Sequence, residues 1–592
     1  MDRQSLIGIV IITILVVVWM WLNTPPQHPP VQTVKKEQAR DTVPAVAPVR
    51  APEPKTAEPA EPYGKYFSAR AAGTERIITI ETDIYTAEFS TKGGLLRKWE
   101  LKQYKTWDGA PVQLVDNAGR GDLTALLTTT DGRVINTRDL YFDASPVGST
   151  VQLEGKFEFE INFTLPSANG GSLVKTVRFR DGEYGFTEDI RMQNLADVVA
   201  NYQYEIAWEH GLRYAEHNSV DESSFAAAYA YTAGELTDID ATKGDEKVQK
   251  ELSGGISWVA TRNKYFAVAL LPESPVPDGA YLEGIRTAAP DNGVVEKYTI
   301  SLKMPYRDNA SEKSTVRVFL GPLEHSVLKS YGKGLESIMS LGWAWLIRPI
   351  SEYLMLPVFT AIHYVVPNWG VVIIIFSILI KIALHPLSKS QMKSMKKMQK
   401  LQPMMEELRE KYKDDPQKQQ HAIMNLYKEY GVNPAGGCLP LLLQLPIMYA
   451  LYAVFRGAIQ LRQAAFVGWI TDLSVPDVIY HLPTKLPLLN LQDISGIALL
   501  MGISMFIQQK MTVKDPRQKA MVWMMPVMMT LLFNGFPSGL NLYYAVFNVL
   551  AIGQQLLINR QDDEEPLRKV EQKKKSGGGI FKFAKDIPRL KK

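Results

Sequence analysis

Residues 368–387 read NWGVVIIIFSILIKIALHPL, and this stretch decides the fold class of the 592-residue chain. From Trp369 onward the run is almost entirely apolar, and it has about the 20 residues that a helix needs to cross a bilayer. One charged residue, Lys381, lies twelve residues after Trp369, which is about 18 Å along a helix. The stretch therefore predicts a membrane-spanning helix with a cation in its interior.

Other apolar runs of similar length predict a multi-pass membrane protein. Spanning helices are expected at 369–387, 437–458, 494–510, 521–536 and 540–558. Residues 5–22 (SLIGIVIITILVVVWMWL) contain no charge and predict a sixth crossing. A cleaved signal peptide is the alternative, but the run is long for a signal core and no small-x-small cleavage site follows, so an uncleaved anchor over 1–22 is favoured.

Two segments beside these runs have a different character. Residues 23–62 contain ten prolines and few large apolar residues, which predicts a disordered tether. Residues 341–368 are apolar but include Arg348, Glu352 and prolines, so we expect an amphipathic helix lying in the membrane interface.

Between residues 63 and 340 the hydrophobic period changes to two. Residues 151–165 (VQLEGKFEFEINFTL) alternate between apolar and polar side chains, and Gly-containing turn signals such as Asn169-Gly-Gly separate such runs. Many short strands with one polar face predict a large antiparallel sandwich, and thus an all-β domain.

The basic residues predict the orientation in the membrane. Segment 388–434 has ten Lys and Arg against six acids, 510–519 has four against one, and 559–592 has eleven against six. Segment 461–493 has only two basic residues. Because basic loops stay in the cytoplasm, both termini are expected there and the β-domain is expected to be exported.

The whole chain is close to neutral at +4, which excludes bulk charge as evidence for nucleic-acid binding. Its single cysteine excludes a disulfide framework and a cysteine-rich zinc site.

Segment 388–434 is predicted to form a cytoplasmic helical hairpin. Apolar side chains recur at spacings of three and four along its first arm: Met392, Met395, Met398, Leu401, Met405 and Leu408. This stripe could hold the two arms together, or it could form a flexible surface that receives apolar segments of another protein. The two interpretations are compatible.

Polar residues inside the predicted spans form the candidate functional site. They are Lys381, Ser377, Gln444, Gln508, Asn541, Tyr544 and Asn548, with Gln509 and Gln555 nearby. The lysine could extend its ammonium to the membrane surface, and the other groups could join helices by hydrogen bonds. A cation with a polar stripe and no carboxylate in any span instead favours a hydrated cavity that attracts acidic segments.

The span predicted at 521–536 is rich in methionine, at Met521, Met524, Met525, Met528 and Met529. These side chains could be lipid-facing filler, or they could form a deformable apolar wall along which many sequences slide.

Several stretches resemble the YidC membrane protein insertase family, in its Gram-negative form. They are residues 368–403, YGVNPAGGCLPLLLQLPIMYALY (430–452), LRQAAFVGWITDLS (461–474) and FPSGLNLYYAVFNVLAIGQQLL (536–557). The resemblance implies a five-helix core around a hydrophilic groove and a β-supersandwich for the exported domain. Lys381 falls where the family usually has arginine, which keeps the charge but loses the bidentate guanidinium. The family's groove threonine falls on Ser377, and its tyrosine on Tyr544.

The function that this resemblance implies is insertion and folding of inner-membrane proteins, alone or with the Sec translocon. The expected partners are nascent membrane proteins, the Sec translocon, the lipid bilayer, and the ribosome and targeting factors. The tail 559–592 could bind ribosomal RNA or anionic lipid, or remain solvated. No catalytic residue, metal or cofactor is expected.

Two rival functions remain open on the sequence. A transporter or channel could use the same cavity, although an inverted repeat is not visible. A sugar-active enzyme is suggested by the resemblance of the β-supersandwich to mutarotase-type domains. Its candidate residues would be Glu209, His210, Glu216 and His217.

Overall fold

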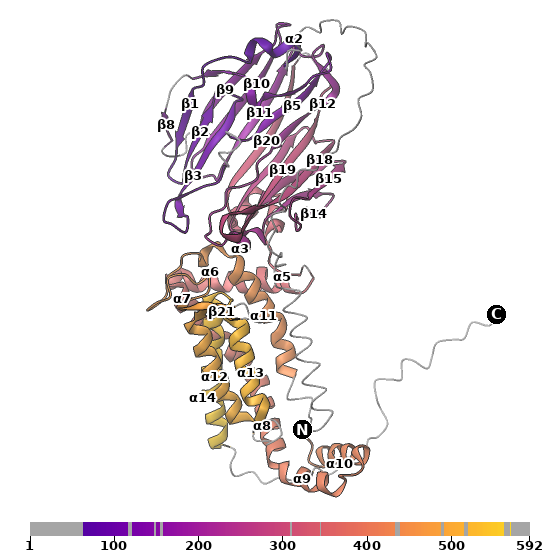
Figure 1. The fold of residues 1–592 in the computed structure, drawn as a ribbon, viewed down its shortest axis with the longest axis vertical. Coiled ribbons are helices and arrows are strands. Elements are labelled where there is room, and N and C mark those ends of the chain that lie inside the picture. Colours follow the sequence, from indigo (N-terminus) through magenta and orange to yellow (C-terminus); the bar gives the residue numbers. More distant parts are fainter. Residues whose placement is uncertain are drawn as a thin grey trace, which may run out of the picture. The chain divides into compact units, whose positions relative to one another are not determined.

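The computed structural model describes residues 63–561 and Lys569, apart from 116–120, 147–149, 154, 156–157, 308–310, 344, 433–438, 487–490 and 514–518. The chain divides into two compact units, Met1–Ser340 and Leu341–Lys592, whose elements are labelled in Figure 1. The predicted anchor and tether (1–62) and nearly all of the predicted tail lie outside the described residues.

The first unit consists mainly of strands, because its alternating sequences bury every second side chain. In β10 (Ser172–Arg180) burial alternates along eight consecutive residues, and the strand pairs on both sides in antiparallel register. The described strands form three sheets, and of their pairs only β1 with β8 is parallel.

The nine-stranded sheet has the order β14 (Glu235–Ile239), β13 (Ala227–Thr232), β16 (Ile256–Arg262), β17 (Phe266–Ser274), β20 (Ser311–Pro322), β11 (Gly185–Gln193), β10, β9 (Glu158–Pro166) and β7 (Asp143–Ser145). The five-stranded sheet has the order β4 (Pro111–Gln113), β3 (Leu95–Lys105), β2 (Tyr85–Ser90), β1 (Ile77–Glu81) and β8 (Thr150–Gln152). The six-stranded sheet has the order β15 (Lys247–Ser253), β18 (Gly279–Ala289), β19 (Gly293–Pro305), β12 (Val199–Trp208), β5 (Thr124–Thr129) and β6 (Val134–Asn136). Short helices lie at α2 (Gly64–Phe67), α3 (Ser219–Ser223) and α4 (His325–Tyr331).

Buried aromatic rings join the five-stranded sheet to the nine-stranded sheet. Phe89 of β2 packs edge-on against Phe179 of β10 and Phe186 of β11, with ring centroids 5.5 and 5.4 Å apart. Trp99 of β3 lies 5.9 Å from Phe186. These contacts form a sandwich core, and the predicted all-β domain is confirmed.

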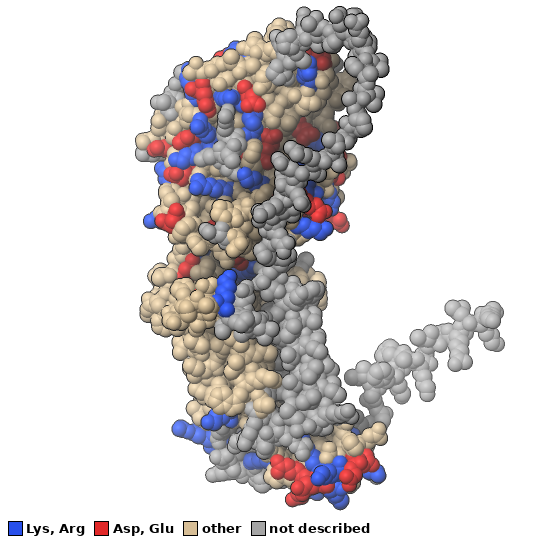
Figure 2. Space-filling model, in the orientation of Figure 1, with Lys and Arg blue, Asp and Glu red and all other residues tan. Residues whose placement is uncertain are grey.

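The second unit is mainly helical, with one small hairpin. Its helices are α5 (Ile347–Pro349), the π-helix η6 (Ile350–Met355), α6 (Leu356–Val365), α7 (Trp369–Ala383), α8 (His385–Lys400), α9 (Gln402–Lys411), α10 (Pro416–Glu429), α11 (Leu439–Gly457), α12 (Gly496–Thr512), α13 (Lys519–Phe533) and α14 (Ser538–Gln561). The hairpin is formed by β21 (Val478–Leu486) and β22 (Leu491–Ser495). On the face that Figure 2 shows, uncharged residues cover most of α12 and α14, whereas charged residues gather on α9 and α10.

Helix α7 is shorter than the span predicted at 369–387. Asn368 caps its first turn, since the side-chain Oδ1 accepts a hydrogen bond from the Val371 amide at 3.1 Å. The helix ends at Ala383, three residues before Pro386, and the following helical stretch leaves at a bend of 63°. Pro386 lies in the first turn of α8, where its missing amide is tolerated, but it cannot donate the hydrogen bond that would continue α7.

The predicted number of six membrane crossings is not confirmed. Among the described helices, Ser538–Ile558 of α14 is long and apolar enough by itself, and the bent pair of α7 with α8–α9 qualifies if it counts as one span. The apolar part of α13, Val522–Phe533, is shorter. At 1.5 Å per residue, helices of 12 to 15 residues extend only about 18–22 Å, less than the hydrocarbon thickness of about 30 Å.

Candidate functional site

A lysine lies where α7 meets α14. The Nζ atom of Lys381 is 4.3 Å from the centroid of the Phe547 ring, and only 8% of the lysine is exposed. Among the described residues no carboxylate forms an ion pair with this ammonium group. A cation–π contact of this kind contributes about 0.5–2 kcal/mol. Lys381 therefore keeps an unneutralised charge that can attract an anion.

The residue that follows Phe547 on α14, Asn548, contacts a third helix, α12. Asn548 donates a hydrogen bond from Nδ2 to the hydroxyl oxygen of Ser504 in α12 at 3.2 Å. Lys381 of α7 thus contacts α14 at Phe547, and the next residue of α14, Asn548, contacts Ser504 of α12. The sequence alone did not single out Ser504, although a serine inside an apolar run is a signal that could have found it.

Two other predicted site residues, Asn541 and Tyr544, lie about two turns and one turn earlier on α14. Asn541 is fully buried; its Nδ2 donates to the Phe533 carbonyl at 3.0 Å, and its Oδ1 has no partner among the described residues. The buried hydroxyl of Tyr544 also has no described partner, and the ring packs edge-on against Phe533 at 5.2 Å. Two polar atoms at the end of α13 are therefore free to bind water or a ligand.

The remaining predicted polar residues are placed differently. Ser377 is fully buried, and its hydroxyl donates to the Ile373 carbonyl of the same helix at 2.7 Å. Gln444 of α11 and Gln508 of α12 are half-buried, and no described contact joins either to Lys381. The Oε1 atom of Gln509, next to Gln508, is buried without a described partner.

A histidine–glutamine pair links the corner between α7 and α8 to α14. His385 Nδ1 lies 3.2 Å from the side-chain nitrogen of Gln554. The side-chain amide of Gln399 farther along α8 donates to the Thr512 carbonyl at the end of α12. The sequence did not predict these two links, because residues so far apart in the chain have no spacing that relates them.

The methionines of α13 lie partly at the surface of the helical unit. Met524 is exposed, while Met525, Met528 and Met529 are half-buried. The side chain of Met521 lies outside the described residues.

The predicted helical hairpin, residues 388–434, has its own apolar core. Leu401, Met405, Leu426, Tyr430 and Val432 are buried together, with Met398 and Leu408 packed against them. Met392 and Met395 are half-buried on α8. The first arm is not one helix as expected, because Leu401 separates α8 from α9 just before Pro403. The buried part of the stripe holds the arms together, and the part on α8 remains partly accessible.

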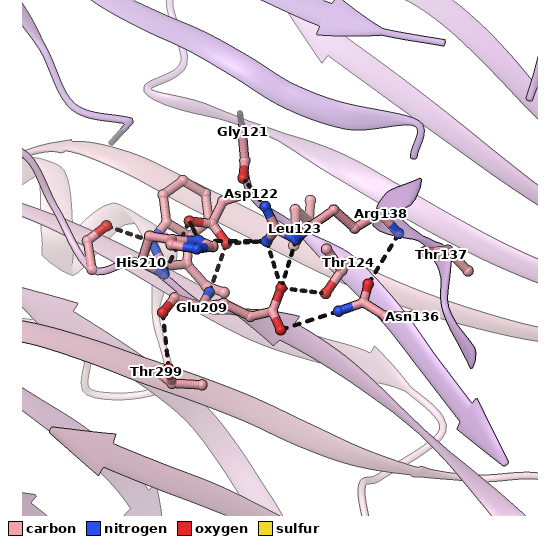
Figure 3. Close-up of polar contacts among 12 residues, drawn as sticks. Gly121, Asp122, Leu123, Thr124, Asn136, Thr137, Arg138, Glu209, His210 and Thr299 are labelled. Atoms are coloured by element: carbon pink, nitrogen blue, oxygen red, sulfur yellow. Dashed lines mark hydrogen bonds and ion pairs between the residues drawn. The ribbon is translucent and has the colours of Figure 1, made fainter. Parts of the chain in front are cut away.

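Acidic groups and a histidine gather in the β-domain, as Figure 3 shows. Single ligand atoms of Asp122, Glu209 and His210 lie within 4.8 Å of one another. Arg138 occupies this cluster: its Nη2 lies 3.6 Å from Asp122 Oδ1 and donates to Glu209, and its Nη1 donates to the Gly121 carbonyl at 2.8 Å. Because the guanidinium already pairs with both carboxylates, the cluster is better suited to fastening the turn after β12 than to holding a metal.

The two histidines that suggested an enzyme have different partners. His210 Nδ1 lies 3.2 Å from Asp122 Oδ2, whereas the ring of His217 packs edge-on against Trp107 at 4.6 Å. The structure therefore provides no contact that would pair them as acid and base among the described residues.

Comparison with known proteins gives the family. Residues 361–565 match the model of the 60Kd inner membrane protein family, and residues 77–353 match that of the YidC periplasmic domain. A relative from Chlorobaculum parvum, named membrane protein insertase YidC, is 40% identical over 95% of this chain and 96% of its own length. The chain belongs to the YidC membrane protein insertase family. A second member with that name, from Chlorobium phaeovibrioides, is 39% identical over 98% of this chain and all of its own length.

The YidC family also includes a solved structure. An active YidC insertase with its first transmembrane domain resolved is 21% identical, with a TM-score of 0.35, over 84% of this chain and 94% of that chain. The two family models identify the protein as an inner-membrane protein with a periplasmic domain.

Proposed function

We propose that this protein inserts other membrane proteins into the inner membrane and helps them fold, the activity for which its relatives are named. The observation that carries the proposal is the unneutralised cation of Lys381, buried where α7 meets α14. A lone charge in an apolar environment is costly, so a lysine at this position needs either water or a passing anion.

Buried polar atoms support a hydrated groove around that cation. Asn541 Oδ1, the Tyr544 hydroxyl and Gln509 Oε1 have no partner among the described residues, and buried polar groups normally have one. A groove lined by such groups would let a hydrophilic segment enter the membrane without losing all of its hydrogen bonds.

The proposed mechanism has three steps. The partly accessible methionines of the hairpin first receive the apolar segment of a new chain. Lys381 and the polar groups of α12 and α14 then hold the hydrophilic end, which lowers its cost of desolvation. The apolar segment finally leaves into lipid along the methionine side chains of α13. The sequence has no GxxxxGK[ST] nucleotide-binding motif, so partitioning and membrane potential supply the driving force.

The arrangement in the membrane is part of the proposal. Residues 1–22 and five spans within 369–558 would cross the bilayer, both termini would be cytoplasmic, and 63–340 would form the periplasmic domain. Residues 341–368 would lie in the interface. The Sec translocon would be a partner in the membrane, and the ribosome and targeting factors would bind the basic hairpin 388–434 and tail 559–592.

The protein would act without catalysing a chemical reaction. In the β-domain, Arg138 already pairs with Asp122 and Glu209, which supports a binding or scaffolding role for the domain over a sugar-active one.

Depletion of the protein in cells tests the proposal. Insertion of a small single-span protein with an acidic exported tail should fall, and re-expression of the intact chain should restore it. Insertion that continues unchanged after depletion would contradict the proposed function.

A further inference from the structure

The segment between α11 and α12 packs on the first turns of three helices. Each of these turns contains a glycine, and a Cβ atom added there would meet this segment. Such a Cβ would lie 2.0 Å from Phe466 Cδ2 at Gly370 of α7, 3.0 Å from Trp469 Nε1 at Gly496 of α12, and 3.1 Å from the Leu473 carbonyl oxygen at Gly539 of α14. These short distances show that the segment packs closely against the three helix starts, most closely at Gly370.

Hydrogen bonds fasten the segment to the same helices. The Ser538 and Gly539 amides of α14 donate to the Val475 and Leu473 carbonyls at 2.8 and 3.0 Å. The buried carboxylate of Asp477 accepts the Ile497 amide of α12 at 2.8 Å. The amide groups at the start of a helix lack partners within it, so the segment satisfies donors that would otherwise be exposed.

This fixed segment presents apolar side chains outward. Val467 is 62% exposed, Trp469 is 52% exposed and Tyr480 is 56% exposed, and Val478 and Ile479 are exposed beside them. The indole nitrogen of Trp469 donates to Asp477 Oδ2 at 2.8 Å, so the polar edge of the ring is already satisfied.

The exposed surface has no positive charge to attract acidic groups. Residues 463–484 contain no lysine or arginine. Of their two acids, Asp477 is buried, and Asp472 is half-buried and accepts hydrogen bonds from the Ser474 amide and hydroxyl at 2.8 and 2.7 Å. An apolar, uncharged surface with tryptophan and tyrosine is typical of the boundary between lipid headgroups and acyl chains.

The surface continues into apolar side chains along a helix. Ile479 contacts the position of a Cβ on Gly496 at 2.9 Å, and the exposed residues Leu499, Leu500 and Ile503 follow on α12. A membrane that covers these α12 residues would also reach the segment.

We propose that residues Val467–Tyr480 are a membrane anchor that inserts into the acyl-chain boundary of the leaflet at which α7, α12 and α14 begin. The occupant is the lipid bilayer itself, bound through apolar contact and not through headgroup charge. The anchor would hold the starts of three helices at one depth in the membrane. This inference rests on the proposed function, because it requires these helices to lie in the bilayer.

Spin labelling in lipid nanodiscs tests the anchor. The single cysteine is first removed as Cys438→Ala, and one label is then attached at Val467→Cys in the full chain. Collision with oxygen should exceed collision with a water-soluble nickel complex, as it does in hydrocarbon. A label at Val276→Cys, which is 66% exposed in the β-domain, should show the reverse order.

A third label separates failure of the anchor from failure of the membrane placement. Val549→Cys lies on the exposed side of α14 and should also favour oxygen. A label at 467 that behaves like the one at 276, with lipid exposure kept at 549, would overturn the anchor alone. Water exposure at both 467 and 549 would overturn the membrane placement and the anchor with it. Low collision with both reagents at 467 would show a protein partner there and would overturn the lipid assignment.

Photo-crosslinking provides a second measurement that keeps Cys438. With p-benzoylphenylalanine in place of Val467, irradiation should yield phospholipid adducts, and the same substitution at Val276 should not. Adducts with peptide only would contradict the proposal.

Discussion

The charge of Lys381 should matter only for substrates that carry a negative charge to it. Lys381→Met removes the ammonium but keeps an unbranched side chain of similar length, and Lys381→Arg restores a positive charge. Each variant is combined with two substrates, identical single-span proteins whose exported tail contains aspartate or asparagine at one position. The four combinations with wild type and Lys381→Met form a double-mutant cycle, which isolates the interaction between the two charges.

The structure sets the size of this interaction. Lys381 has no described carboxylate partner and is 8% exposed, so a substrate carboxylate could approach Nζ to about 4 Å. At that distance the attraction is about 1 kcal/mol in water and about 4 kcal/mol in a partly desolvated site. About 1.4 kcal/mol corresponds to a factor of ten in rate. Lys381→Met should therefore lower the insertion rate of the aspartate substrate roughly 5- to 1000-fold more than it lowers the rate of the asparagine substrate.

The assay is the initial rate of protease protection of the exported tail in membrane vesicles that contain each variant. Lys381→Arg serves as the matched control and should retain most of the rate with the aspartate substrate. Equal losses for the two substrates in Lys381→Met would refute the reasoning, because the lysine would then act through packing or by extending to the membrane surface.

Three further predictions concern stability. Burial of Glu222 raises the pKa of its carboxyl to about 8 from its ordinary 4.5, so the folded β-domain binds a proton that the unfolded chain releases between these values. The contribution of Glu222 to the free energy of unfolding in urea should therefore be greatest below about pH 4.5 and fall by up to ~5 kcal/mol as the pH rises through 8. Glu222→Gln should remove this part of the pH dependence, and parallel pH profiles of the variant and the wild type would contradict the prediction. Asp477→Ala removes the acceptor for three hydrogen bonds, so amide exchange at the start of α12 should accelerate and the free energy of local opening there should fall by about 2–4 kcal/mol. Unchanged exchange at the start of α12 would contradict the role of Asp477 in fastening this helix. Arg138→Met leaves the carboxylates of Asp122 and Glu209 without their cationic partner and should lower the free energy of unfolding of the β-domain in urea by about 3–5 kcal/mol. A decrease of less than about 1 kcal/mol would show that the cluster is not structural.

The sequence predicted elements well where a single period dominates. The alternation around residues 151–165 led to the all-β domain, and the apolar runs located helices near α7, α12 and α14. It did not predict the order of the strands, because β11 pairs with β20 more than a hundred residues later. The hairpin β21–β22 was also missed, since residues 478–495 do not alternate and were interpreted only by their lack of basic residues.

The candidate site could be predicted only as a set of residue types. The spacing placed Asn541, Tyr544 and Asn548 on one side of α14, but it could not show that Asn548 meets Ser504 while Asn541 binds the Phe533 carbonyl. These differences come from how the helices pack, because the two neighbours belong to other helices, Ser504 to α12 and Phe533 to α13.

Reconstitution with the purified full chain tests whether this protein inserts other membrane proteins by itself. Liposomes containing only this protein receive a newly synthesised single-span substrate with an acidic exported tail, and the fraction of tails that become protected from added protease is measured. Protection should depend on the protein and fall in liposomes containing Lys381→Met. The same protected fraction in protein-free liposomes would contradict the claim that this chain inserts membrane proteins.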